Sequence, residues 1–148
     1  TPLAIDGAKI RLALAKTPIV IVPGFSAVDE AGECVLLGRG GSDISAVFIA
    51  QALGLDSVRL FKDVDGLYDS DPNKFEDAAR LEYVDFDTAR EIGGELIQLE
   101  AIDFAASKNV HIDIAAIGKS YASRIGPVRP VAHPVAIDTI SAQVNLGC

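Results

Sequence analysis

The chain has 148 residues, 49% of them hydrophobic, which is enough apolar material for one folded domain. Its formal net charge is −8 and its 13 Lys and Arg residues form no cluster, which argues against nucleic-acid binding by phosphate neutralisation. The apolar runs are too short to cross a bilayer and no signal segment precedes them, so we expect a cytoplasmic protein without membrane contact. Cys34 and Cys148 match no metal-binding or disulfide pattern and are expected to be free thiols.

Both ends of the sequence suggest a piece of something longer. The chain starts without methionine close to a predicted helix at residues 7–16, and it carries three prolines within residues 127–134. We expect residues 1–126 to form one α/β domain and residues 127–148 to be a proline-containing tail or linker.

The first half of the chain predicts a strand, a hairpin and a buried helix. The β-branched run at residues 19–22 is typical of a strand that is buried on both faces. Residues 25–28 and 34–37 predict a hairpin with a glycine-containing turn. After a glycine-rich loop, Ser42 is the expected cap of a helix that runs to Leu53 and is apolar nearly all round.

The second half alternates strands and helices. Strands are predicted at residues 57–62, 83–84 and 110–117, and a polar loop is predicted at residues 63–80. Asp85 is expected to cap a helix that ends near Ile92, and a further helix is predicted at residues 97–108. This alternation predicts a mostly parallel sheet sandwiched by helices, with ligands at the carboxyl ends of the strands.

The segment Leu37-Gly38-Arg39-Gly40-Gly41-Ser42-Asp43 is a candidate ligand loop. Its three glycines allow the backbone to approach a ligand, and the loop leads into a helix start, where anions are favoured. Arg39 offers a planar fork for a carboxylate or phosphate, and Asp43 in the first turn is suited to an ammonium group. A glycine-rich turn alone is equally compatible with a structural loop, and the Walker spacing is absent.

A second candidate loop runs from Lys62 to Pro72 and contains four aspartates. Its glycine directly follows the second aspartate, so the spacing of a calcium-binding EF-hand loop is not met and no metal site is predicted. Composition alone favours a solvated acidic loop.

Taken in order, residues 22–25, 37–43 and 62–72 resemble the aspartokinases of the amino acid kinase superfamily, over about residues 17–126. The resemblance implies an amino acid kinase (carbamate kinase-like) fold, with this chain as the C-terminal, nucleotide-side half of the kinase domain. It also implies transfer of the ATP γ-phosphate to the side-chain carboxylate of aspartate, with Mg²⁺ bound through ATP and no catalytic residue assigned in this half.

By the same resemblance, the glycine-rich loop would bind aspartate, with Arg39 on a carboxylate and Asp43 on the amino group. The implied aspartate-binding residues are Arg39, Gly40, Gly41, Ser42 and Asp43. The implied ATP-binding residues are Lys62, Asp63, Gly66, Tyr68, Asp71, Pro72 and Lys74, with Asp63 and Tyr68 near the ribose and adenine.

The sequence departs from the aspartokinase pattern at several positions. No Lys-Phe-Gly-Gly-Thr segment precedes Thr17, and Lys62 stands where the family usually has threonine. Asn73 replaces an arginine, with Lys74 as a substitute, and Glu95 replaces a nucleotide-contacting lysine. Phosphoryl transfer depends on positioned positive charge, so we expect this chain by itself to be inactive.

Two hypotheses of different classes follow. In the first, the chain is part of an aspartate kinase, whose partners would be aspartate, ATP and either identical subunits or the remainder of a longer polypeptide. In the second, it is a catalytically degenerate aspartokinase-like domain that serves regulation or assembly, in one version fused to a homoserine dehydrogenase.

Neither His111 nor His133 has neighbours at metal-ligand spacing, and both are expected to be structural or solvent-exposed.

Overall fold

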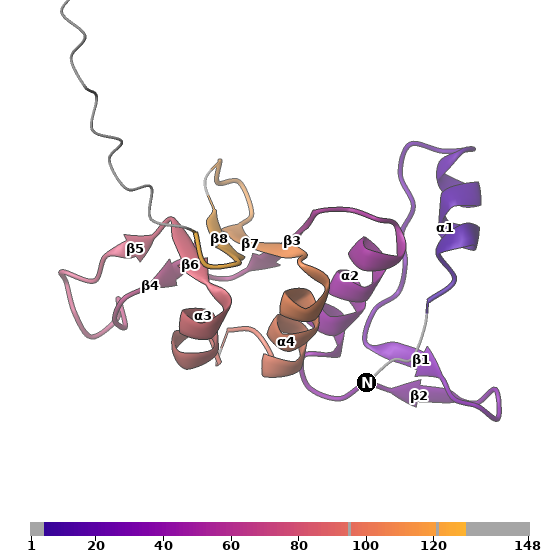
Figure 1. Ribbon diagram of the computed structural model, residues 1–148, viewed down its shortest axis with the longest axis horizontal. Helices are drawn as coiled ribbons and strands as arrows, with labels where there is room; N and C mark the ends of the chain where they lie inside the picture. Colours follow the sequence, from indigo (N-terminus) through magenta and orange to yellow (C-terminus); the bar gives the residue numbers. More distant parts are fainter. Residues whose placement is uncertain (1–4, 95, 121, 130–148) are drawn as a thin grey trace, which may run out of the picture.

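The computed structural model describes residues 5–94, 96–120 and 122–129, and a four-stranded sheet organises them (Figure 1). The strands are β3 (Ser57–Lys62), β6 (Tyr83–Asp85), β7 (His111–Ala116) and β8 (Ser123–Gly126), in the order β3-β7-β8-β6. β3 is parallel to β7 and β6 is parallel to β8, whereas β7 and β8 are antiparallel. The prediction of a mostly parallel sheet is therefore confirmed.

Three helices pack against this sheet and against one another: α2 (Gly41–Ala52), α3 (Phe86–Ile92) and α4 (Leu99–Lys108). The rings of Phe48 on α2 and Phe104 on α4 are stacked, with centroids 3.8 Å apart. Apolar side chains from the sheet and the helices form one core. Burial of this core is the main favourable contribution to folding of the domain. Its fully buried members include Val47, Ile97, Ile102, Ile112, Ile114 and Ile125.

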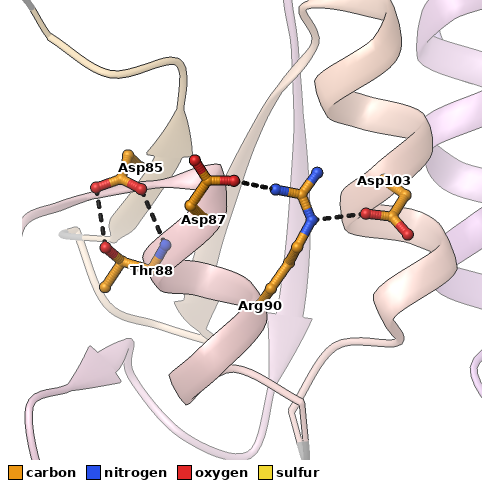
Figure 2. Close-up of polar contacts among 5 residues, drawn as sticks. All are labelled: Asp85, Asp87, Thr88, Arg90 and Asp103. Atoms are coloured by element: carbon orange, nitrogen blue, oxygen red, sulfur yellow. Dashed lines mark hydrogen bonds and ion pairs between the residues drawn. The ribbon is translucent and has the colours of Figure 1, made fainter.

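Polar contacts fix α3 at its start and along its side (Figure 2). Asp85 is the N-cap, as predicted, and its carboxylate accepts hydrogen bonds from the backbone N–H and the hydroxyl of Thr88, both at 2.9 Å. Arg90 pairs with Asp87 one turn earlier and donates from Nε to Asp103 on α4 at 2.7 Å. The guanidinium thus links two helices that pack side by side.

The remaining elements lie at the two ends of the molecule (Figure 1). At one end are α1 (Gly7–Leu14) and the predicted hairpin, formed by β1 (Ser26–Val28) and β2 (Cys34–Leu36). α1 contributes no buried residue and is tied to α2 by a hydrogen bond from Arg11 to the carbonyl of Ala52. At the other end is a short antiparallel pair, β4 (Leu67–Tyr68) and β5 (Arg80–Leu81).

Three details differ from the sequence-based expectations. Residues 19–22 do not form a strand: Ile19 and Ile21 are 74% and 91% exposed, because no described strand lies alongside to pair with this segment. Ser42 is not the cap of α2, since the helix begins at Gly41 and Gly40 is the N-cap in a left-handed conformation. The region predicted as loop, residues 63–80, contains β4 and the start of β5.

Several residues that the sequence singled out lie outside the described part of the chain. These are Glu95, His133, Cys148 and all of the expected tail except residues 127–129. Within the described part, no helix has the length and apolar character needed to span a membrane.

Candidate functional site

The glycine-rich loop needs glycine where it enters α2. Gly40 has a φ of 75°, and a Cβ there would overlap the side chain of Gln98 in the segment before α4. A Cβ on Gly41 would lie 2.6 Å from the Cβ of Leu37, closer than real Cβ contacts allow. Both positions therefore disfavour a larger residue, because Gly40 lies against Gln98 and Gly41 lies against Leu37.

Asp43 in the first turn of α2 contacts Lys62 at the end of β3. Lys62 Nζ lies 2.9 Å from Oδ1 and 2.8 Å from Oδ2 of the Asp43 carboxylate. The two side chains are only 19% and 9% exposed, so this ion pair is largely removed from water. The contact brings the ends of the two predicted ligand segments together, although 19 positions separate them in the sequence.

The other polar side chains of the glycine-rich loop face solvent. Arg39 and Ser42 are both exposed. Within the described part of the chain, the Arg39 guanidinium forms neither an ion pair nor a hydrogen bond, so it is available to an anion. The loop therefore presents one accessible cation beside a carboxylate that is already paired.

A pocket of about 530 Å³ lies beside the second segment. This volume falls within the range of small-molecule sites. Of the predicted ATP-binding residues, Gly66, Tyr68, Asp71, Pro72 and Lys74 line it, whereas Lys62 and Asp63 do not. The other lining residues are Val64, Leu67, Asp69, Ser70, Asn73, Ile92 and Leu96.

Ile92 and Leu96 reach this pocket from the end of α3 and the turn that follows. They are distant in sequence from residues 63–74, and no motif pointed to them. The one available signal was that apolar residues flank the Gly93-Gly94 break, which also fits a purely structural role. Their side chains add apolar surface to the lining of the pocket.

Hydrogen bonds within the loop hold the polar wall in shape. The carboxylate of Asp71 accepts from the backbone N–H of Asn73 at 3.0 Å and pairs with Lys74 at 3.1 Å. The hydrogen bond from Asn73, supported by the contact with Lys74, holds the pKa of Asp71 below its ordinary value. Tyr68 donates its hydroxyl proton to Asp65 at 2.7 Å. The predicted substitute cation, Lys74, is thus partly neutralised by Asp71.

Ser123 on β8 anchors the base of this loop. Its hydroxyl oxygen accepts a hydrogen bond from the N–H of Leu67 at 2.8 Å, and the hydroxyl donates to the carbonyl of Leu81 at 2.5 Å. One buried side chain thereby ties both β4 and β5 to the central sheet. A Cβ at Gly66 would overlap this hydroxyl, so glycine is required there as well.

The elements and contacts are those of an α/β domain, and the comparisons with known proteins define its class. The sequence profile of the amino acid kinase family matches residues 2–117, so the chain belongs to this family. Within the family the chain is aspartokinase-like. It is 40% identical over 115 residues to an aspartate kinase of Pseudomonas putida, and the match covers 76% of this chain and 28% of that protein.

A second relative agrees with this assignment, and two solved structures share the fold. The chain is 33% identical to an aspartokinase of Mycobacterium tuberculosis in an alignment of 153 residues that covers 93% of this chain and 36% of the relative. The fold matches E. coli aspartokinase III in complex with aspartate and ADP, with a TM-score of 0.68, 23% identity and coverage of 85% and 31%. It also matches UMP kinase from Ureaplasma parvum, with a TM-score of 0.59, 19% identity and coverage of 84% and 54%.

The chain spans 28% to 36% of the length of these two aspartokinase relatives.

Proposed function

We propose that this chain carries the acceptor-binding loop and the nucleotide-binding pocket of an aspartate kinase. The complete protein would transfer the γ-phosphate of ATP to the side-chain carboxylate of aspartate. The observation that carries the proposal is the contact between Asp43 and Lys62, which joins the glycine-rich loop to the strand end where the pocket loop begins. An acceptor at the loop and a nucleotide in the pocket would then lie at the same end of β3.

The side chains suit these two ligands by their chemistry. The exposed Arg39 would pair with a carboxylate of aspartate through parallel N–H donors. In the pocket, the Tyr68 ring and the apolar side chains of Ile92 and Leu96 would contact the base. Lys74 would face the phosphates as a point charge. Mg²⁺ would arrive bound to the ATP phosphates and would neutralise the charge that develops during transfer.

The relatives support the choice of aspartate and ATP. Proteins 33% to 40% identical to this chain are aspartokinases, and the E. coli enzyme that shares the fold was solved with aspartate and ADP. Biosynthesis of amino acids, a cytoplasmic location and self-association remain predictions of the same proposal.

Two substitutions test the two subsites by calorimetry on the 148-residue chain. Arg39→Ala is expected to weaken aspartate binding by about 1.5–3 kcal/mol, the usual value for a hydrogen-bonded charge. Lys74→Met is expected to weaken Mg·ATP binding about fivefold, because the lysine is largely exposed and shared with Asp71. The matched control is Lys9→Met, because Lys9 forms a surface ion pair with Asp6, distant in sequence from both loops. If both variants bind like the unaltered chain, the two subsites are wrongly assigned.

Two observations favour the alternative of a catalytically degenerate, regulatory or assembly domain. Asp43 is already neutralised by Lys62, and Lys74 is already paired with Asp71. Among the described residues that line the pocket, Lys74 is the sole cation. Such a domain would still bind nucleotide or aspartate, so binding supports the site and only turnover separates the two functions.

A further inference from the structure

The segment that follows β8 is held against β6 by Tyr83. The Tyr83 hydroxyl donates a hydrogen bond to the carbonyl of Pro127 at 2.6 Å. The guanidinium carbon of Arg129 lies 3.6 Å from the centroid of the Tyr83 ring, which is a cation–π contact. Residues 127–129 are exposed, so burial in the core does not hold them in place. The two contacts between Tyr83 and residues 127–129 form an exit clamp.

The last residue of β8 leaves room for this clamp. A Cβ on Gly126 would lie 2.5 Å from the hydroxyl oxygen of Tyr83 and 2.6 Å from a ring carbon of His111. Both distances are shorter than real Cβ contacts allow, so a larger residue would push the Tyr83 hydroxyl away. Glycine therefore lets this hydroxyl pass close to the backbone and reach the carbonyl of Pro127.

A single short strand connects the exit clamp to the pocket. β8 has four residues, of which Ser123 is the first, and the clamp follows the last. Ser123 accepts a hydrogen bond from the N–H of Leu67 and donates one to the carbonyl of Leu81, which anchors the loop that lines the pocket. At about 3.3 Å per residue, the two ends of β8 are about 10 Å apart. The pocket loop and the exit clamp thus hold opposite ends of the same strand.

The position of Ser123 depends on the register of β8. β8 pairs with β6 over only three residues, and the Asp113–Arg124 pair joins its middle to β7. A slip of one residue would turn the Ser123 hydroxyl to the other face of the sheet, away from Leu67 and Leu81, because successive side chains alternate between faces. The exit clamp adds a contact to β6 beyond the last paired residue, so it opposes fraying and slippage from that end.

We propose that Tyr83 is a positioning residue of the pocket, which clamps residues 127–129 so that β8 holds Ser123 against the pocket loop. The part that concerns ligands rests on the proposed function, in which the pocket binds Mg·ATP. Release of the clamp then loosens the Ser123 anchor and, with it, β4 and β5. Nucleotide in the pocket in turn favours the clamped state, because coupling between two sites is reciprocal.

Amide hydrogen exchange of the 148-residue chain tests the clamp without nucleotide. Tyr83→Phe/Arg129→Ala loses a hydrogen bond and an exposed cation–π contact, so the Leu67 amide is expected to exchange about five- to tenfold faster. The amide of Ile102, in the core of α4, should keep its rate because the opening is local. Mg·ATP binding, measured by calorimetry on the same variant, should weaken by up to the same factor.

Two further variants separate the clamp from a general effect of surface substitution. Arg129→Lys keeps a cation for the Tyr83 ring and should retain most of the Leu67 protection that Arg129→Ala loses. Lys108→Ala removes the cation that lies 6.0 Å from the centroid of the Phe104 ring on α4, and it should leave Leu67 exchange unchanged. Circular dichroism checks that each variant is folded.

Unchanged protection of Leu67 in the double variant would overturn the proposal. Equal acceleration at Leu67 and Ile102 would also overturn it, because the clamp would then support the whole fold and not the pocket loop. Faster exchange at Leu67 with unchanged Mg·ATP affinity would overturn the role of Tyr83 in the pocket. If the unaltered chain binds no Mg·ATP, the proposed nucleotide site fails, and exchange at Leu67 still decides whether the clamp holds the Ser123 anchor.

Discussion

Asp113 and Arg124 lie directly opposite each other on the antiparallel strands β7 and β8. The guanidinium donates from Nε and Nη2 to the two carboxylate oxygens, at 2.7 and 2.8 Å. The Asp113 side chain is 9% exposed and that of Arg124 is 46% exposed, so the pair lies at the edge of the core. Hydrogen bonding to Asp113 raises the pKa of Arg124 above its ordinary value, and the arginine stays charged at every pH of interest.

Arg124→Met is expected to destabilise the domain by about 1–2 kcal/mol. The substitution leaves the Asp113 carboxylate in the sheet without its partner, and the partial exposure of the pair reduces the cost below that of a fully buried one. The double variant Asp113→Asn/Arg124→Met should recover part of the loss, because it removes the unpaired charge as well. Urea denaturation of the three proteins measures this. A double variant less stable than Arg124→Met would contradict the argument.

Ser123→Ala is expected to lower the free energy of unfolding by about 1–3 kcal/mol. The fully buried hydroxyl serves both the N–H of Leu67 and the carbonyl of Leu81, and alanine leaves both groups without this partner. The loop that lines the pocket should also become more mobile, so Mg·ATP binding is expected to weaken in the same variant. Hydrogen exchange at the Leu67 amide gives a local readout. Unchanged protection there would show that Ser123 does not anchor the loop.

Asp85 predicts a pH-dependent contribution to stability. Hydrogen bonds from the backbone N–H and then the hydroxyl of Thr88 hold its pKa below 3.8, the ordinary value. A lowered folded-state pKa stabilises the fold fully above 3.8, and this contribution is lost as the pH falls through the folded-state pKa. Asp85→Asn retains a capping side chain without the titration, whereas Asp85→Ala loses the cap at every pH.

Thermal unfolding from about pH 2 to about pH 7 distinguishes these variants. The melting temperature of Asp85→Asn should fall less on acidification than that of the unaltered chain. Asp85→Ala should be less stable than the unaltered chain at neutral pH. If Asp85→Asn and the unaltered chain have parallel acid profiles, the cap does not contribute to acid unfolding.

The 148-residue chain is expected to release no measurable ADP from Mg·ATP in the presence of aspartate. Phosphoryl transfer is driven by positioned positive charge, and both lysines near the site are engaged: Lys62 by Asp43 and Lys74 by Asp71. A coupled assay with the Pseudomonas putida aspartate kinase as positive control measures this. Turnover above about one per second, an ordinary enzyme rate, would show that the remaining groups suffice.

Local sequence patterns determined most of the elements and the family. The hairpin, α3 with its cap Asp85, and the strands β3 and β7 could be predicted because alternation, capping side chains and glycine turns act over a few residues. The ordered motifs at residues 37–43 and 62–72 were sufficient to indicate an aspartokinase-like chain, because each is contiguous in sequence.

Only the tertiary structure decided the features that depend on neighbours distant in the chain. The β-branched residues 19–22 have strand propensity, but a strand also needs a partner for its backbone, and no described strand provides one. The sequence placed Asp43 and Lys62 in separate ligand loops, and packing of α2 beside β3 made them an ion pair. The anchoring role of Ser123 also depends on the tertiary structure, because folding brings its hydroxyl to the backbone of Leu67 and Leu81. No local sequence pattern predicts hydrogen bonds between residues so distant in the chain.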